Sequence, residues 1–375
     1  MEKYYFEGYL RKEGTAGTRN YIGVVCSVIC SSVIANDISS KVPGTVPIIH
    51  SNGCAQLGDD FQVTKDMLVG VASNPNLYSA LLVGLGCETN QISGLLDSIP
   101  KTKPVEGIGI QQLGGGENTL QKGVHIAERW AKELSDKRER LPLSNLTVGV
   151  VSVDIDEESL EKVHPVVGKV IDSLVAHDAT VIMGITDTLA PAGPLLSERS
   201  EKKEVRAELS NLGEESYRKR WKETNSKVHA ARNFSKEEKD LAALEAKLAG
   251  TSTIKGLLAY SENAEECGLY LTKASSNLVE TLSNMISCGC NIALVVSSRG
   301  TLTGSIALPS MTLTPKSADG GAFEELVDYM VTEEDADIQS RNVIEELIKI
   351  SSGKKTALEE YGLGEFSIPH VGTTF

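Results

Sequence analysis

Short apolar runs alternate with stretches of helical spacing along the first 110 residues. Helix-like stretches cover Ser31–Val42 and Thr64–Ser73. Strands that alternate with helices predict a parallel sheet covered on both faces, so we expect a first α/β domain over residues 1–140. Its predicted strands are rich in β-branched residues and bounded by Gly, Pro or Ser: Tyr21–Val28, Val46–His50, Ala80–Leu85 and Val105–Ile110.

The same alternation returns after the charged stretch Arg129–Arg140, which indicates a helix end and a linker. We expect a second α/β domain over residues 141–375. Residues 197–250 interrupt its pattern because they are dense in helix formers and mixed charge. They predict an insertion of solvated helices, with a subunit-contact arm or an active-site lid as alternatives. The predicted strands of this domain are Leu146–Val153, Ala179–Ile185, Gly268–Leu271 and Asn291–Ser297.

Net charge narrows the classes of partner. A formal charge of −14 argues against nucleic acid and against an anionic membrane surface, since both require a concentrated Lys/Arg patch. The longest apolar run, Ile292–Ser298, has strand length, and the amino terminus lacks the apolar core of a signal peptide. Seven cysteines without a secretion signal indicate reduced thiols. We therefore expect a cytoplasmic protein.

Polar turns follow three predicted strands of the first domain. They carry Cys30, His50, Cys54, Cys87 and Glu88. Ligands of open parallel sheets bind beyond the carboxyl ends of the strands, so we expect these side chains to converge on one rim. Free cysteines are commonly small buried residues, and the spacing here has no CxxC signature. A structural role and a metal or cluster role both remain open for the cysteines, and a structural role remains open for His50.

Two arginines and a glycine-rich turn are further candidates for binding an anion. Gly114–Gly116 lies between a strand and a long helix, where the helix start offers free N–H groups. Arg299 follows a predicted strand, and a guanidinium pairs bidentately with a carboxylate. Arg19 precedes a strand, a position that favours a structural role. The acids of Asp154–Glu158 suit either a metal or the first turn of a helix.

Common catalytic motifs are absent from the sequence. It has no GxGxxG after the first strand, no GxxxxGKS/T, no HExxH and no GxSxG. Nucleotide kinase, simple dehydrogenase, zincin and esterase functions therefore lack motif support.

A series of short motifs runs from one end of the chain to the other. They comprise Phe6–Arg11, Gly17–Asn20, Cys30-Ser31, Gly53-Cys54, Asn74–Asn76, Val83–Gln91, Gln111, Gly289–Asn291, Ser298–Thr301, Gly304, Pro309, Glu365-Phe366, Pro369 and Gly372. Together they resemble the large catalytic domain of the altronate/galactarate dehydratase family. The resemblance implies a lyase that eliminates water, or a comparable leaving group, from a small sugar acid or hydroxy acid. A branch of the family resembles sulfolactate sulfo-lyase and eliminates sulfite.

The resemblance also implies a cofactor, partners and residue roles. It implies a divalent metal, Fe²⁺ first with Mn²⁺ or Mg²⁺ as alternatives, a separately encoded small SAF-like subunit, and a homo-oligomer. Glu88, His50 and Arg299 become the candidate catalytic residues. The candidate metal ligands are Cys54, Cys87 and Glu88. The candidate substrate-binding residues are Arg19, Asn20, Asn90, Gln91, Gln111, Gly115 and Thr301.

The second domain departs from the family pattern in three places. Val151–Asp156 replaces a glycine-rich GGSD-type segment, and Ile185–Gly193 replaces a glutamate-rich one. A PGN…GG stretch has no counterpart ahead of Leu241–Gly250. The loss of polar groups predicts a preference for a shorter or less hydroxylated acid. The alternative is a catalytically degenerate subunit that binds a sugar acid or regulates a partner.

Overall fold

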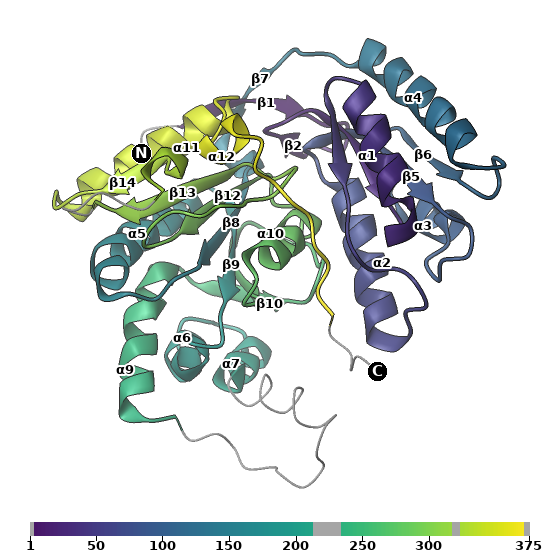
Figure 1. Cartoon of the computed structure of the whole chain (residues 1–375). Coiled ribbons are helices and arrows are strands. Elements are labelled where there is room, and N and C mark those ends of the chain that lie inside the picture. Colours follow the sequence, from purple (N-terminus) through teal and green to yellow (C-terminus); the bar gives the residue numbers. More distant parts are fainter. Residues whose placement is uncertain (1–3, 213–233, 317–322, 371–375) are drawn as a thin grey trace, which may run out of the picture.

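The computed structural model describes residues 4–212, 234–316 and 323–370 and contains two parallel sheets flanked by helices (Figure 1). The first sheet has the order β4 (Thr45–Ile48), β3 (Tyr21–Cys26), β5 (Leu77–Gly84) and β6 (Val105–Gly109), all parallel. Helices α1 (Ser32–Lys41) and α4 (Gly116–Glu133) pack against one face, and α2 (Gly58–Ser73) and α3 (Ile92–Ser98) against the other. The predicted α/β class is confirmed.

Continuous apolar sequence explains why β3 and β5 are the central strands of the first sheet. β5 buries seven of its eight residues, and β3 buries five of six. Helices cover both faces of the sheet, so an alternating pattern would place polar side chains in the core.

The second sheet is larger, and all its strands are parallel. Its order is β10 (Ile254–Leu258), β11 (Gly268–Lys273), β9 (Thr180–Ile185), β8 (Thr147–Ser152), β12 (Ile292–Val296), β13 (Ser310–Pro315) and β14 (Tyr329–Val331). The sequence predicted β8, β9, β11 and β12 but not β10, β13 or β14. The chain leaves β8 toward β9 and later returns to its other side as β12, so the topological switch point lies between β8 and β12.

Helices cover this sheet on both faces as well. α5 (His164–Ala176) and α11 (Ala336–Ser351) pack together on one face, and α10 (Leu278–Ser287) lies on the other. The described parts of the predicted insertion are helical, as α6 (Gly193–Ser197), α7 (Lys203–Ser210) and α9 (Lys236–Glu245). A capping box of Ser235 and Glu238 fixes the start of α9. Residues 213–233 of the insertion lie outside the described residues.

The two domains meet through helix packing and asparagine side chains. α2 packs against α10 between the two sheets. Asn74 Nδ2 donates to the carbonyl oxygens of Ile286 and Cys290, at 2.7 and 2.8 Å. Asn76 Nδ2 donates to the carbonyl of Asn291 at 3.0 Å. The amino ends of β5 and β12 are therefore held together.

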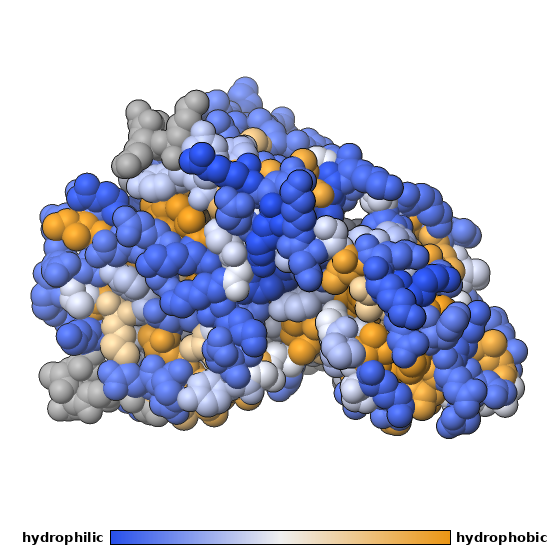
Figure 2. Space-filling view, turned by 90° about the horizontal axis from the view of Figure 1, so that it is seen from above, coloured by the Kyte–Doolittle hydropathy of each residue, from blue (hydrophilic) through white to orange (hydrophobic). Residues whose placement is uncertain are grey.

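A small antiparallel sheet lies beside this junction. Its order is β2 (Ala16–Gly17), β1 (Tyr5–Leu10) and β7 (Glu139–Pro142). The face in Figure 2 is largely hydrophilic, with hydrophobic residues in separate groups. No helix within the described ranges is long and apolar enough to cross a membrane.

Candidate functional site

The turns after β3, β4 and β5 lie at one edge of the first sheet, because these strands are parallel neighbours. Ser27 Oγ donates to Glu88 Oε1 at 3.0 Å, which joins the turn after β3 to the turn after β5. The backbone N–H of Ile29 donates to the carbonyl of Asn52 at 3.0 Å, which joins it to the turn after β4. We call residues 26–31, 50–54, 84–91 and 111 the first-domain rim. The structure thus brings the three predicted turns together.

Glu88 provides a buried carboxylate at this rim, with only 3% of the residue exposed. Its Oε1 accepts from Ser27, and its Oε2 accepts from the backbone N–H of Gly86 at 2.5 Å. Gly84 makes room for it, since a Cβ there would lie 2.2 Å from Glu88 Oε1. Of the ion pairs found among the described residues, none includes Glu88. Two hydrogen bonds therefore orient this carboxylate.

His50 has both ring nitrogens occupied. Nε2 donates to the carbonyl of Cys26 at 2.9 Å, and Nδ1 accepts from the backbone N–H of Asn52 at 3.1 Å. Burial lowers the pKa of His50 to about 4. A neutral imidazole with no free nitrogen is a poor base and a poor metal ligand. The structure therefore gives His50 a role in holding the rim, and its catalytic role stays a prediction.

His50 should make stability depend on pH. Its pKa is about 4 in the folded chain, below the ordinary 6.5. The stability that the neutral imidazole contributes to the fold is therefore present above pH 6.5 and is lost as the pH falls toward 4. We expect this residue alone to give a slope of about 1.4 kcal/mol per pH unit inside that window. Urea unfolding at several pH values measures the slope. His50→Gln should remove this part of it, and an unchanged slope in that variant would refute the assignment.

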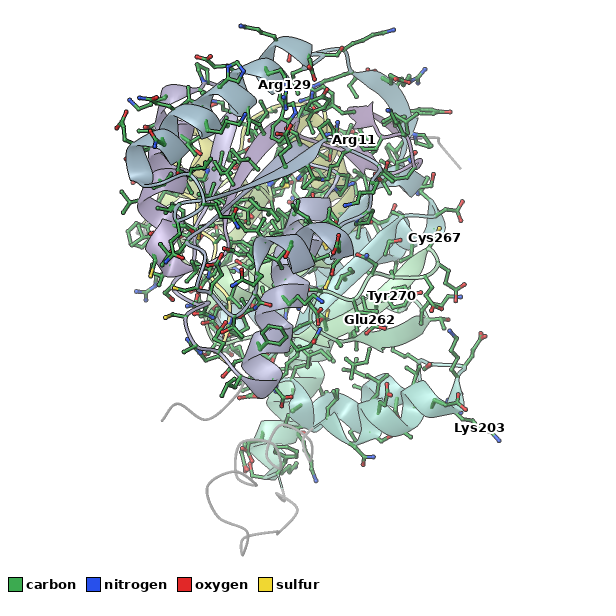
Figure 3. The ribbon with its side chains drawn as sticks, turned by 90° about the vertical axis from the view of Figure 1, so that its right-hand side faces the viewer. Arg11, Arg129, Lys203, Glu262, Cys267 and Tyr270 are labelled. Atoms are coloured by element: carbon green, nitrogen blue, oxygen red, sulfur yellow. The ribbon has the colours of Figure 1, made fainter. Side chains whose placement is uncertain are left out.

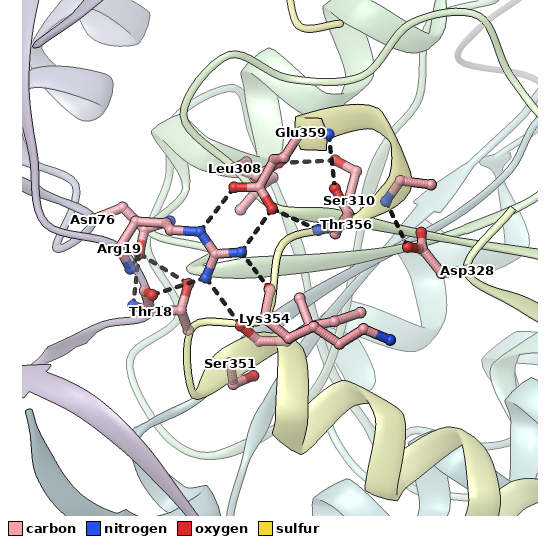
Figure 4. Close-up of polar contacts among 12 residues, drawn as sticks. Thr18, Arg19, Asn76, Leu308, Ser310, Asp328, Ser351, Lys354, Thr356 and Glu359 are labelled. Atoms are coloured by element: carbon pink, nitrogen blue, oxygen red, sulfur yellow. Dashed lines mark hydrogen bonds and ion pairs between the residues drawn. The ribbon is translucent and has the colours of Figure 1, made fainter. Parts of the chain in front are cut away.

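Arg19 and Asn20 lie at the opposite end of the sheet from the rim, because they precede β3. The Arg19 guanidinium donates to both carboxylate oxygens of Glu359, at 2.7 and 2.6 Å, and to the carbonyls of Ile350 and Lys354 (Figure 4). Asn20 accepts from an arginine and donates to a backbone carbonyl. Arg19 thus joins the two domains, whereas the Asn20 contacts stay within the first domain, and a substrate role for either residue stays a prediction.

Arg299 lies at the carboxyl edge of the second sheet, directly after β12 and beside the switch point. Its side chain is exposed in a small crevice that is also lined by Thr314, Glu324 and Met330. Within the described ranges no hydrogen bond or ion pair involves its guanidinium. Thr301 Oγ1 is buried and has no partner there either. The structure thus leaves the Arg299 guanidinium accessible to a ligand and buries the Thr301 hydroxyl.

Asp154 fills part of the same edge. Its Oδ2 accepts from Ser297 Oγ at 2.8 Å and from the backbone N–H and Oγ of Ser298, both at 3.1 Å. Asp156 Oδ1 accepts from the backbone N–H of Ser159, as an acid at a helix start does. These two acids therefore orient turns of the protein itself.

The remaining predicted contacts divide into two groups. Asn90 Nδ2 donates to the carbonyl of Phe61, and Gln91 Nε2 donates to the carbonyl of Glu88, so both hold the rim turn. Gln111 is an exposed residue of the rim and lies beside Gly86. Gly115 starts α4 with φ +132° and open space around its Cα, so it and Gln111 remain accessible to a ligand.

The predicted single-metal site is not found. No group of three or more His, Cys, Asp or Glu side chains in the described part of the chain is arranged to hold one metal ion. Cys54 and Cys87 are exposed, whereas both oxygens of Glu88 already accept hydrogen bonds. The ligand set Cys54, Cys87 and Glu88 therefore stays a prediction that the described geometry does not support.

The end of the chain connects the rim to the second domain. Glu365 pairs with Ser305 in the loop that follows Arg299. Three residues further on, the carbonyl of Ile368 accepts from Asn52 Nδ2 at 3.0 Å. One short segment thus links the loop that carries Arg299 to the rim.

Family comparisons cover both domains. The sequence model for the second domain of D-galactarate dehydratase/altronate hydrolase matches residues 8–135, and the model for the C-terminal region of D-galactarate/altronate dehydratase matches residues 143–374. The chain belongs to this dehydratase family. The resemblance inferred from the short motifs is confirmed.

Named relatives of this family member are similar over nearly its whole length. Altronate dehydratase of Bacillus subtilis (strain 168) is 25% identical over 98% of the chain and 78% of the relative. The (2R)-sulfolactate sulfo-lyase subunit beta of Chromohalobacter salexigens is 25% identical over 98% of the chain and 97% of the relative. Galactarate dehydratase (L-threo-forming) of Escherichia coli (strain K12) is 27% identical over 97% of the chain and 76% of the relative.

Two site residues of this dehydratase-family chain escaped the sequence reasoning. Ser27 directly follows β3, so the strand-end rule that selected Cys30 could also have selected it. Glu359 had no such signal, because its partner Arg19 is 340 residues away in the sequence.

Proposed function

We propose that this chain is a lyase that eliminates water, or a comparable leaving group, from a small hydroxy acid. The match of family models to both domains is the observation that carries the proposal. The relatives are named as dehydratases or as a sulfo-lyase subunit, and both names describe eliminations. A buried carboxylate at the first-domain rim and an exposed arginine at the carboxyl edge of the second sheet are groups that such chemistry needs.

The reaction requires a base beside the substrate carboxylate. In our proposal Glu88 removes the proton from the carbon next to that carboxylate, and Ser27 and Gly86 hold its oxygens in position. The leaving group then departs with the electron pair of its bond, and the enol formed tautomerises to a 2-keto acid. Negative charge grows on the substrate carboxylate, so hydrogen-bond donors there stabilise the transition state. Gln111 and the amide groups at the start of α4 are suitable donors on the rim.

Arg299 is our proposed anchor for the acid. Arg299→Ala should weaken hydroxy-acid binding by about 10- to 100-fold, because a charge-assisted hydrogen bond typically contributes about 1.5–3 kcal/mol. Folding should be nearly unaffected, since the guanidinium is exposed. Calorimetric titration with a panel of acids measures the change, and Arg341→Ala, at an exposed position of α11, is the control. Unchanged affinity for every acid that the wild type binds would exclude this anchor.

A second candidate function is binding without turnover, in a regulatory or degenerate subunit. The position of Asp154 favours it, because this carboxylate occupies hydrogen-bond donors of Ser297 and Ser298 beside Arg299. Acid binding with no product formation would support this alternative. A C–S lyase is a third form of the same elimination, and the relative named as a sulfo-lyase subunit supports it.

Partners also remain a proposal. We propose a separately encoded small subunit, because the sulfo-lyase relative is itself named as one subunit and is matched over 97% of its length. Copurification of the two gene products would test the assembly.

A further inference from the structure

The turn that carries Arg299 is held by a side chain from the neighbouring strand. Arg299 lies in the turn 297–300 after β12, and Asp154 follows β8, which pairs with β12. Asp154 Oδ2 accepts from Ser297 Oγ at 2.8 Å and from the backbone N–H and Oγ of Ser298, both at 3.1 Å. The backbone N–H of Arg299 in turn donates to Ser297 Oγ at 3.4 Å. One carboxylate oxygen therefore gathers the two residues that precede Arg299.

This contact fixes the backbone of Arg299 without neutralising its charge. Of the ion pairs found among the described residues, none joins Asp154 to Arg299. On the other side of Arg299, Gly300 has φ +86°, and its carbonyl oxygen lies 2.9 Å from Ser297 Oγ. The exposed guanidinium thus extends from a backbone that is held on both sides, and it stays accessible to an anion.

A buried pair of a serine and a histidine holds Asp154 from behind. Ser152, the last residue of β8, donates its hydroxyl hydrogen to the carbonyl of Asp154 at 3.1 Å. Its Oγ also lies 3.0 Å from Nε2 of His164, which is fully buried at the start of α5. A hydroxyl has a single hydrogen, so Ser152 accepts from Nε2–H of His164. A line of hydrogen bonds therefore runs from α5 through the end of β8 to the turn of Arg299.

We propose that Asp154 is a positioning residue for Arg299, and that Ser152 supports it in this role. The proposal rests on the proposed function, in which Arg299 anchors the carboxylate of a small hydroxy acid. A guanidinium binds a carboxylate best through two parallel hydrogen bonds, a geometry that requires a well-placed side chain. A backbone that is ordered before the acid arrives also lowers the entropy cost of binding. His164 completes the support, because burial lowers its pKa to about 4 and keeps the imidazole neutral.

Positioning and simple electrostatics predict opposite effects when this carboxylate is removed. Asp154→Ala removes a negative charge beside the anchor, and that change alone would strengthen the binding of an anion. If the carboxylate positions the turn, the variant should instead bind the acid about 10-fold more weakly, because a small misplacement of a binding group is costly. Asp154→Asn loses the same charge but keeps an oxygen that can accept from the backbone N–H of Ser298, so it should recover most of the affinity.

Calorimetric titration of the full chain with a panel of hydroxy acids separates positioning from general damage. A positioning defect raises Kd and leaves the number of binding sites per chain unchanged, whereas partial unfolding lowers the number of sites and leaves Kd unchanged. Ser152→Ala should raise Kd in the same way but by a smaller factor than Asp154→Ala. Glu262→Ala is the matched control and should leave Kd unchanged. Glu262 also accepts a backbone N–H, from Ala259 at 2.7 Å, but it lies after β10 at the far edge of the same sheet (Figure 3).

A double variant shows whether Asp154 acts through Arg299. Asp154→Ala combined with Arg299→Ala should bind the acid as weakly as Arg299→Ala alone, because the side chain that is positioned is already gone. Losses that add in the double variant would mean that Asp154 contributes to binding by another route, and they would overturn the positioning role.

Hydrogen exchange of the turn tests the support without any ligand. The backbone amides of Ser298 and Arg299 should exchange faster in Asp154→Ala than in the wild type, as measured by mass spectrometry of the peptide that contains them. Unchanged exchange, or unchanged or tighter acid binding in the folded variant, would overturn the proposal. Faster exchange in the variant together with a wild type that binds no acid would contradict the proposed function and leave the support of the turn standing.

Discussion

Arg19→Ala should lower the free energy of unfolding by about 3–5 kcal/mol, because removing one partner of a buried ion pair leaves the other charge unpaired. The side chains of Arg19 and Glu359 are only 7% and 17% exposed, and two hydrogen bonds join them (Figure 4). Burial opposes ionisation of Glu359, but the hydrogen bonds and charge of Arg19 outweigh it and lower its pKa. Denaturant unfolding of the purified variant measures the loss.

The matched control is Arg129→Ala. Arg129 pairs with Glu106, and these side chains are 44% and 41% exposed, so the pair should contribute no more than about 1 kcal/mol. If Arg19→Ala were as stable as the control and instead lost affinity for hydroxy acids, Arg19 would be the substrate clamp that the sequence suggested.

Glu88→Gln should reduce kcat by about 10²–10⁴-fold, the range in which general acid–base catalysis contributes. The amide keeps the shape of the side chain, but it cannot accept a proton from the substrate at neutral pH. The limb of the pH–rate profile that reports the free base should disappear with it. Steady-state kinetics of 2-keto acid release measure both effects.

Glu128→Gln on the exposed face of α4 is the control for Glu88→Gln and should leave kcat unchanged. A folded Glu88→Gln protein that retains kcat within about threefold of the wild type would exclude Glu88 as the base. A variant that fails to fold is replaced by Glu88→Asp, which keeps the carboxylate and should retain part of the activity.

The strands with the most continuous apolar sequence could be predicted, whereas β10, β13 and β14 could not. β3, β5, β8, β9 and β12 are runs of apolar residues covered by helices on both faces. β13 reads Ser-Met-Thr-Leu-Thr-Pro and is buried throughout, yet its polar residues disguise it. Asp328 accepts from the backbone N–H of Thr312 within it, a contact that local sequence does not reveal. β14 has only three residues, too few for a period to appear.

The candidate site was predictable as far as the strand-end rule applies. That rule places the turns of Cys30, Cys54, Cys87 and Glu88 at one edge of the sheet, where the structure also has them. The rule does not say which side chains already have hydrogen-bond partners within the protein. His50 has both nitrogens engaged by backbone groups of its own and a neighbouring turn, and only the folded geometry shows it.

The most direct test of the central claim is kcat/KM for 2-keto acid formation across hydroxy acids of about three to six carbons. The chain is assayed alone and together with the proposed small subunit. We expect loss of substrate and matching 2-keto acid release, with the best values for a shorter or less hydroxylated acid, because Asp154 occupies polar donors that a longer acid would need. A clear optimum at altronate or galactarate would contradict the specificity. Binding of acids with no product from any of them would contradict the lyase itself.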